Sequence, residues 1–285
     1  MNSAARDIRP ESENHLPDLL DMVYRERGWD FRNYKSSSIS RRISKRLRAH
    51  NVAGYQDYLR IVEADPAELN RLFASLTIKV SEFFREPEVF DRLSRLIDPR
   101  LTLSGAPLTS QGVRAWCCGC ANGEEAYSLA MLLSERLAPG ALGKTKIFAT
   151  DIDNDALDNA RRASYREEFA RNVPIEARQR HFVSADGLLE VKDEIRGMVR
   201  FGRLDIVRDW PLSRMDIVFC RNLFIYFNKA LQEAVFKKLD YALRQGGILV
   251  LGKAEVIPQS FSSGYESAGE SIHIKTCLRA THRQR

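Results

Sequence analysis

The stretch AWCCGCANGEEAYSLAMLL, residues 115–133, changes its hydrophobic pattern partway along. It begins with a short apolar run typical of a buried strand and ends with the periodicity of an amphipathic helix. Between these parts lie three cysteines, two glycines and the adjacent pair Glu124 and Glu125. A loop of this composition between a strand and a helix is compatible with a metal site, with a nucleotide-binding loop that lacks its usual glycines, or with another kind of site, and the rest of the sequence distinguishes these.

Strands and helices alternate through the rest of the C-terminal part of the chain. Alternation of this kind predicts a parallel, doubly wound sheet. Residues 181–207 interrupt it with the short apolar pieces HFV, LLEV and MVRF and are predicted to form a small β insertion. The predicted strands are 113–117, 146–149, 215–220, 246–252 and 272–277, and the predicted helices are 124–137, 156–163 and 229–243.

The N-terminal part shows helical periodicity only, with breaks at Gly28, Gly54 and Pro66. It predicts a small helical bundle, followed by a further helix over 88–96 and a connector over 98–111. The first fourteen residues are polar and are expected to be a loose tail. No apolar run approaches the roughly 18–20 residues that span a bilayer, and no signal-peptide pattern is present. We therefore expect a cytoplasmic chain with reduced cysteines and no membrane insertion.

Residues 36–51 combine an apolar stripe with a basic surface. Ile39, Ile43 and Leu47 repeat every four residues, the spacing of one helix face. One of Ser36 to Ser40 is expected to cap this helix. A solvated charged face is the ordinary interpretation, but a run without acidic residues favours a polyanionic partner: nucleic acid, an acidic lipid face or an acidic protein helix. The cations of this segment are Arg41, Arg42, Lys45, Arg46 and Arg48.

The ends of the predicted strands carry the candidate site, because ligands bind there in open parallel sheets. Asp151 ends the second strand, where a carboxylate can accept from both ribose hydroxyls. The alternative is that Asp151 only caps the next helix, although Asp153 or Asn154 suits that role better. Further polar residues at strand ends are Asp205, Arg221, Asn222 and Tyr226.

The loop after the first strand argues against a dinucleotide. Gly119 and Gly123 do not have the spacing of a phosphate-binding loop, and Glu124 and Glu125 would repel phosphate. A cationic ligand such as S-adenosylmethionine fits better. The cysteines lie too close together to ligate one ion, and no second Cys/His cluster has zinc-like spacing. We therefore expect no metal site and interpret the cysteines as buried packing residues.

Five motifs, in this order and at similar spacing, resemble those of CheR-type chemoreceptor glutamate methyltransferases. The resemblance covers roughly residues 16–278, including the basic helix. It implies an α/β fold with a Rossmann-like methyltransferase domain over 112–285, an N-terminal all-helical domain over 15–88, a linker over 89–111 and a small antiparallel β-subdomain inserted at about 180–203. The motifs are TIKVSEFFRE, WCCGCANGEEAYSLA, FATDID, FCRNLFIYF and GGILVLGKAE.

The resemblance also implies an activity and a site. Members use S-adenosylmethionine to convert receptor glutamates to methyl esters, leaving S-adenosylhomocysteine. Arg85 and Tyr226 are implied as catalytic residues that orient the incoming carboxylate, with Tyr226 near the transferred methyl. The cofactor-binding residues implied by the motifs are Ser81, Arg85, Glu125, Asp151, Asp205, Ile206, Arg221 and Asn222.

Three positions depart from the commonest family pattern. Lys79 stands where the family often has Asn, so it is left out of the expected site. Ser81 replaces Thr and keeps the hydroxyl. Asp205 replaces Asn and can accept from the adenine amino group, but it cannot donate to a ring nitrogen.

The implied partner of the basic helix is the glutamate-rich helical bundle of a chemoreceptor. Family members that also bind a receptor C-terminal pentapeptide tend to have extra glycines in a loop of the β-subdomain. The corresponding loop here, VSADGLLEV, is short and has only Gly187, so we expect no pentapeptide tether. A monomer is expected.

Two other classes remain open. Another S-adenosylmethionine enzyme could grip RNA with the basic helix, although no aromatic-interleaved basic strand of the RNA-binding kind is found, so no nucleic acid is expected. A cofactor-sensing scaffold could bind receptors without turnover. A nicotinamide dehydrogenase is disfavoured because the phosphate loop is missing.

Overall fold

The computed structural model describes residues 15–77, 79, 81–97 and 112–276. By contacts the chain divides into two compact units, one of residues 1–78 with 226–231 and one of residues 79–225 with 232–285. This division falls ten residues before the predicted boundary after residue 88. The predicted tail over 1–14, the connector over 98–111 and Cys277 lie outside the described residues.

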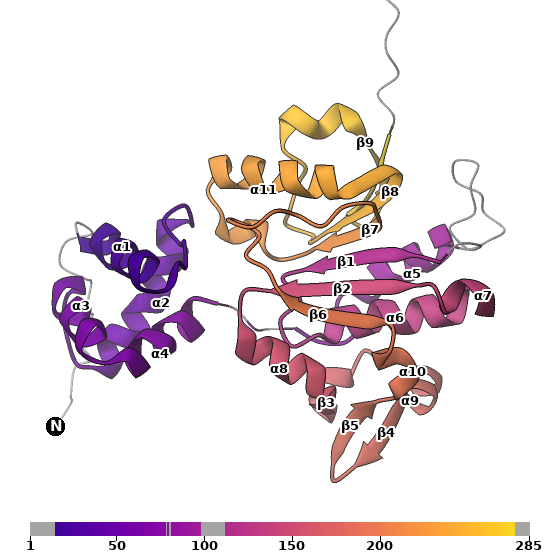
Figure 1. Ribbon diagram of the computed structural model, residues 1–285, viewed down its shortest axis with the longest axis horizontal. Helices are drawn as coiled ribbons and strands as arrows, with labels where there is room; N and C mark the ends of the chain where they lie inside the picture. The colour runs from indigo at the N-terminus through magenta and orange to yellow at the C-terminus, as the bar shows by residue number, and fades with distance from the viewer. Residues whose placement is uncertain (1–14, 78, 80, 98–111, 277–285) are drawn as a thin grey trace, which may run out of the picture. The chain divides into compact units, whose positions relative to one another are not determined.

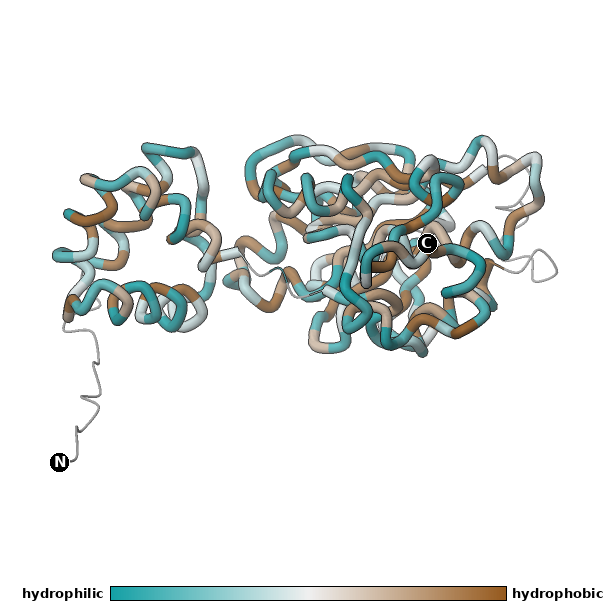
Figure 2. The backbone as a smooth tube through the Cα atoms, turned by 90° about the horizontal axis from the view of Figure 1, so that it is seen from below, coloured by the Kyte–Doolittle hydropathy of each residue, from teal (hydrophilic) through white to brown (hydrophobic). Residues whose placement is uncertain are grey.

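The described residues of the first unit form four helices, in agreement with the helical bundle predicted for the N-terminal part. The helices are α1 (Leu16–Arg27), α2 (Ser36–Ala49), α3 (Tyr55–Ala64) and α4 (Pro66–Leu76). Along each of them polar and apolar residues are mixed (Figure 2).

The helix boundaries follow from local chemistry at Gly28 and Asp65. Gly28 ends α1 in the left-handed conformation, and Asp65 caps α4 by accepting from the N–H of Ala67. The apolar stripe predicted for α2 is buried, but its predicted serine cap is wrong. The N-cap position is Lys35 without a side-chain cap, because Ser36 to Ser40 all lie inside the helix.

The second unit is a seven-stranded sheet in the order β6-β2-β1-β7-β8-β10-β9 (Figure 1). The first five of these strands run parallel, and β10 and β9 are antiparallel additions. The strands are β1 (Arg114–Cys118), β2 (Lys146–Asp151), β6 (Val199–Arg203), β7 (Met215–Cys220), β8 (Leu243–Leu251), β9 (Tyr265–Gly269) and β10 (Ile272–Lys275). All six residues of β7 are buried, as in a strand covered on both faces.

Helices cover this sheet, and short elements complete the unit. They are α5 (Pro87–Ile97), α6 (Glu124–Arg136), α7 (Pro139–Leu142), α8 (Asn154–Arg162), η2 (Glu167–Ala170), α9 (Ile175–His181), α10 (Asp193–Arg196), η3 (Phe224–Tyr226), α11 (Lys229–Ala242) and η4 (Gln259–Gly264). The helix predicted over 88–96 is α5, and it belongs to this unit rather than to a linker.

A separate three-stranded antiparallel sheet, β3-β5-β4, lies beyond α8 at the lower end of the unit (Figure 1). Its strands are β3 (Ser164–Arg166), β5 (Leu188–Val191) and β4 (Phe182–Ala185). The insertion therefore starts earlier than the predicted 180–203. The piece MVRF was assigned to it wrongly, because β6 pairs in parallel with β2 in the main sheet.

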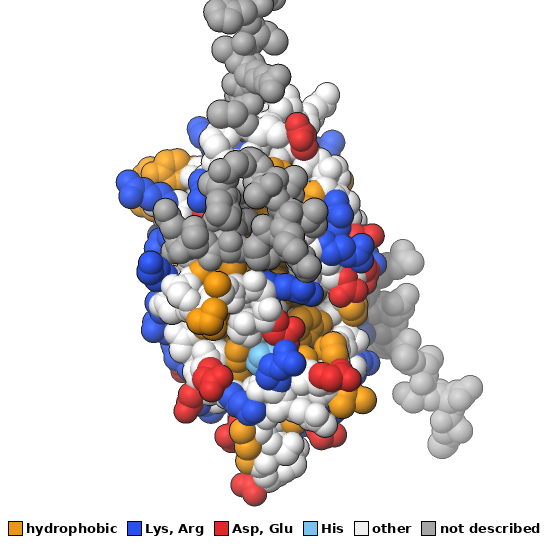
Figure 3. Space-filling model, turned by 90° about the vertical axis from the view of Figure 1, so that its right-hand side faces the viewer, with side chains coloured by type: hydrophobic (Ala, Val, Ile, Leu, Met, Phe, Trp, Pro, Cys, Tyr) orange, Lys and Arg blue, Asp and Glu red, His pale blue; other side chains and the backbone are white. Residues whose placement is uncertain are grey.

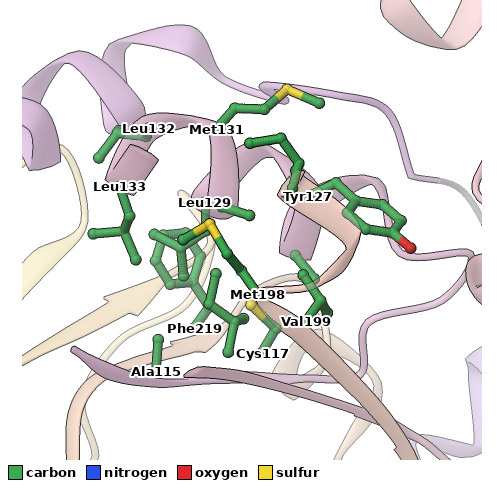
Figure 4. Packing of buried hydrophobic residues seen from close by; sticks show 14 of the residues in the cluster. Ala115, Cys117, Tyr127, Leu129, Met131, Leu132, Leu133, Met198, Val199 and Phe219 are labelled. Carbon is green, nitrogen blue, oxygen red and sulfur yellow. The ribbon is translucent and has the colours of Figure 1, made fainter. Parts of the chain in front are cut away.

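Packing between α6 and the sheet forms the centre of the core (Figure 4). Leu129 and Leu133 of α6 face Ala115 and Cys117 of β1, with Phe219 of β7 beside them. The side chains of Cys117, Cys118, Cys120 and Cys220 are buried and free, which confirms their interpretation as packing residues for the described cysteines. On the face of this unit drawn in Figure 3, basic, acidic and apolar side chains are interspersed wherever the surface is described.

Candidate cofactor site

The loop after β1 is a tight turn held against the end of β2. The N–H groups of Gly119 and Cys120 both donate to the carbonyl of Thr150, at 2.8 and 3.0 Å. Gly123 has φ 93°, and a Cβ there would lie 2.9 Å from the Cβ of Ala160 on α8. Only glycine satisfies both constraints, so the loop can approach α8 closely. From the same loop, the N–H of Ala121 donates to Asp151.

Asp151 ends β2 and is held by two backbone donors. Its Oδ1 accepts from the N–H of Asp153 and its Oδ2 from the N–H of Ala121, both at 2.9 Å. Burial raises the pKa of this carboxyl, and the two N–H donors act against the increase. Capping of α8 falls to Asp153, which accepts from the N–H of Ala156 at 3.1 Å. The alternative role of Asp151 as a helix cap is therefore excluded.

Lys79, one of the departures from the family pattern, has a specific partner. Its Nζ lies 2.6 Å from Oδ2 of the buried Asp153. Lys79 therefore forms an ion pair two residues from Asp151, the carboxylate predicted for the ribose.

Arg221 joins three segments of the site. Its side chain is 1% exposed, and its guanidinium lies 2.8 Å from Glu86 Oε2 and 3.2 Å from Glu125 Oε2. It also donates to the carbonyl of Arg85 at 3.0 Å. Burial raises the pKa of Glu125, and Arg221 opposes this increase. Two carboxylates around one guanidinium leave the cluster with a net negative charge, which suits a cationic ligand.

The two adjacent glutamates at the start of α6 have different surroundings. Glu125 faces Arg221, whereas Glu124 is 1% exposed and accepts a hydrogen bond from the side chain of Ser81. Burial raises the pKa of Glu124 to about 7. Among the described residues, Oε2 of Glu124 and Nε of Arg221 are buried without a hydrogen-bond partner. Such unsatisfied atoms call for an explanation, and a ligand is one.

Asp205 and Ile206 lie in a loop that is held from two sides. Asp205 Oδ1 accepts from the N–H of Val207 at 2.9 Å, and burial raises the pKa of Asp205. From α11, Nζ of Lys238 donates to the carbonyls of Ile206, Val207 and Asp209 at 2.8 to 2.9 Å. Lys238 could not be identified from the sequence, because its acceptors are main-chain atoms, which every residue type carries.

Tyr226 groups with residues 1–78 and not with the residues of the cofactor site. In that unit the guanidinium carbon of Arg42 lies 5.1 Å from the centroid of its ring. Its place near a transferred methyl therefore remains a prediction.

The five cations of α2 do not form one surface. Arg42 donates to the carbonyl of Leu76 at 2.7 Å, and Arg46 donates to the buried Glu68 at 2.6 and 2.9 Å. These two arginines hold the helical unit together, which corrects the expectation that they face a partner. The exposed cations of the helix are Arg41, Lys45 and Arg48.

Comparison with known proteins adds independent information. Residues 79–271 match the model described as CheR methyltransferase, SAM binding domain, and residues 14–77 match CheR methyltransferase, all-alpha domain. The chain is 34% identical over 257 residues to a putative methyltransferase Cher3 of Pseudomonas putida, covering 87% of this chain and 91% of that protein. It is 29% identical over 252 residues to the chemotaxis protein methyltransferase of Escherichia coli, covering 86% and 85%.

A further relative is longer than this chain. An uncharacterized 104.1 kDa protein of Rhodobacter capsulatus is 36% identical over 232 residues, which cover 81% of this chain and 24% of that protein. The chain thus corresponds to about a quarter of that protein's length. No described helix is long and apolar enough to cross a membrane.

Proposed function

Because the chain belongs to the CheR methyltransferase family, we propose that it transfers the methyl group of S-adenosylmethionine to glutamate side chains of chemoreceptors, forming methyl esters. The matches confirm the predicted family, the α/β methyltransferase fold and the cofactor. The observation that carries the proposal is the cluster of Glu86, Glu125 and Arg221, in which two half-buried carboxylates flank one buried guanidinium at the carboxyl ends of parallel strands.

Each end of the cofactor has a candidate binding group. Glu125 would bind the methionine ammonium, and Asp151 would accept from the ribose hydroxyls. Ser81 would contact the same ligand from the segment before α5, and Asp205 with Ile206 would line the adenine. When bound, S-adenosylmethionine supplies an electrophilic methyl group on a sulfonium.

The chemistry of methyl transfer needs little from the protein beyond placement. A glutamate carboxylate has an unperturbed pKa of about 4.3, so it is ionised at neutral pH and requires no general base. A desolvated site favours the reaction of an anion with a cation, and in-line alignment supplies much of the remaining rate enhancement. Arg85 and Tyr226 would orient the incoming carboxylate. Strong bidentate binding of this carboxylate would also stabilise the ground state of the substrate, so we expect Arg85 and Tyr226 to bind it only partially.

The exposed cations of α2 are proposed to dock the substrate. Arg41, Lys45 and Arg48 can meet the glutamates of a receptor bundle, which raises the association rate at low salt. We further propose that the enzyme acts as a cytoplasmic monomer without nucleic acid and without a pentapeptide tether. The short turn at Asp186 and Gly187 between β4 and β5 supports the last point.

The test uses methyl-labelled S-adenosylmethionine, the purified chain and membranes that contain chemoreceptors. We expect incorporated label to be released as volatile methanol by mild alkali, the behaviour of a carboxyl methyl ester. Label that resists alkali would contradict the proposal and indicate another acceptor atom. If the chain binds the cofactor but no label is incorporated into any receptor tested, the alternative of a non-catalytic, cofactor-sensing scaffold would be favoured.

A further inference from the structure

The segment after β7 adopts a backbone conformation that needs support. Asn222 has φ 58°, in the left-handed region, and it directly follows Arg221 at the end of the strand. This region costs most L-residues roughly 1–2 kcal/mol, although asparagine tolerates it better than most. A cofactor residue in this conformation keeps it only when its surroundings over-determine it.

Glu255 provides that support. Its carboxylate belongs to a residue that is only 6% exposed, and it collects three backbone donors. Oε2 accepts from the N–H of Asn222 at 2.9 Å and of Gly252 at 2.7 Å, and Oε1 accepts from the N–H of Phe224 at 2.7 Å. Hydrogen bonds to an ionised acceptor are about twice as strong as neutral ones. Glu255 therefore fixes the backbone on both sides of Leu223.

Gly252 lies against the same contact. A Cβ at this position would meet Glu255 Oε2 at 2.8 Å and the backbone nitrogen of Asn222 at 3.0 Å. Its φ lies outside the left-handed region, so the restriction is space alone. The end of β8 is thus shaped to let the carboxylate reach the segment after β7.

A second effect of Glu255 is electrostatic. Its charge acts on Glu125 in the direction that raises the pKa of Glu125, so the two carboxylates are close enough to interact. Glu255 therefore adds negative potential on the side where a cationic ligand would bind.

We infer that Glu255 is a positioning residue for the cofactor: it holds Asn222 and Arg221 in the geometry that binds S-adenosylmethionine without touching the reacting atoms. The inference rests on the cofactor part of the proposed function and not on the receptor substrate.

The first experiment measures binding of S-adenosylhomocysteine by calorimetry, in the absence of receptor, for the wild-type chain and Glu255→Gln. Glutamine keeps one carbonyl oxygen but turns an NH₂ group towards a backbone donor, so at least one N–H loses its acceptor. We expect the Kd to rise about tenfold, equivalent to about 1.4 kcal/mol. In the transfer assay the KM for S-adenosylmethionine should rise by a similar factor, with kcat within about threefold of wild type.

Two matched variants separate positioning from stability. Asp216→Asn removes another buried carboxylate, at the opposite end of β7, where Asp216 accepts from the N–H of Arg114 at 2.7 Å. It should lower the melting temperature and leave the Kd unchanged. An equal loss of affinity in Asp216→Asn, or a Kd within about twofold of wild type in Glu255→Gln, would overturn the inference.

Gly252→Ala keeps the charge of Glu255 but places a Cβ too close to Glu255 and to the backbone nitrogen of Asn222. It should therefore also raise the Kd for S-adenosylhomocysteine. Gly264→Ala is its control, because a Cβ there meets nothing within 4 Å. If Glu255→Gln does not fold, the comparison of Gly252→Ala with Gly264→Ala tests the inference instead. Equal affinity of these two variants for S-adenosylhomocysteine would refute it. Failure of the wild-type chain to bind S-adenosylhomocysteine would instead contradict the proposed function itself.

Discussion

Two buried glutamates, one in each unit, have pKa values that are shifted in opposite directions. Glu68 in α4 is 0% exposed and Glu124 in α6 is 1% exposed. Burial acts to raise the pKa of both. For Glu68 its hydrogen-bond and ion-pair partners outweigh burial and hold the pKa at about 2, whereas for Glu124 burial prevails and the pKa is about 7. The partners of Glu68 are Arg46, His50, Tyr58 and Arg71.

The two glutamates differ in how completely their carboxylates are hydrogen-bonded. Glu68 joins α2, α3 and α4. Its carboxylate is ionised because both of its oxygens have hydrogen-bond or ion-pair partners. Glu124 bonds to Ser81 and keeps one oxygen without a partner among the described residues. Proteins depart from full polar satisfaction mainly where function requires it. The same residue type, equally buried, is therefore fully paired in one unit and keeps an unpaired oxygen next to the proposed cofactor site in the other.

Removing Glu68 should produce the largest effect. Glu68→Ala leaves Arg46 and Tyr58 without their acceptor, and loss of one partner of a buried pair costs about 3–5 kcal/mol. We expect the helical unit to unfold at a much lower denaturant concentration, as followed by circular dichroism. Glu63→Ala, an exposed glutamate of α3, is the control. A loss below about 1 kcal/mol would mean that Glu68 is not the structural centre of this unit.

Removing the charge of Glu124 should raise the free energy of unfolding at high pH, whereas removing Glu68 lowers it. Its folded-state pKa lies above the unfolded value of 4.5, so the folded state holds the proton more tightly. This contribution to stability is complete below pH 4.5 and is lost as the pH rises through about 7. A shift of this size corresponds to about 3 kcal/mol. Glu124→Gln should therefore be more stable than wild type at pH 8 and about equal at pH 5.

Urea unfolding at the two pH values measures this difference. Glu176→Gln, an exposed glutamate of the same unit, should show no such pH dependence. For Glu68 the sign is reversed, because its stabilisation is present above pH 4.5 and is lost as the pH falls towards about 2. If Glu124→Gln were less stable than wild type at pH 8, the ionised form would have a partner, and the contrast between the two glutamates would disappear.

Periodicity in the sequence predicted most of the elements but not the partners of their side chains. The strand over 215–220 and the breaks at Gly28, Gly54 and Pro66 are visible because burial and backbone geometry act on neighbouring residues. The insertion was misplaced because a four-residue apolar piece such as MVRF does not reveal which sheet it joins. Pairing with β2 decided that, and pairing is a long-range property.

Residues in recognisable motifs could be named from the sequence as candidates for the site, whereas those that act on main-chain atoms could not. Arg221 and Glu125 come from recognisable motifs and lie together as expected. Glu255 and Lys238 bind two loops of the candidate site through backbone N–H and carbonyl groups, which every residue type carries. Their roles become visible only when the chain is folded.

The basic helix offers the smallest and most specific test. Arg46 and Lys45 are adjacent in the sequence, yet Arg46 is committed to Glu68, which is 22 residues away, while Lys45 is exposed. Charge reversal of Arg41, Lys45 and Arg48 together should lower receptor methylation about tenfold at low salt, with the loss shrinking as salt screens the attraction. The melting temperature should hardly change, because exposed charges contribute little to stability.

Arg60→Glu, on α3 of the same unit, is the control for charge reversal at an exposed position outside α2, since Arg60 is exposed and pairs only loosely with Asp57 at 3.4 Å. Arg46→Glu should behave in the opposite way to the triple variant, losing stability first and activity only as a consequence. Methylation that survives reversal of the three exposed cations would remove the docking role from α2. The contrast between paired and exposed cations on this helix would then carry no function.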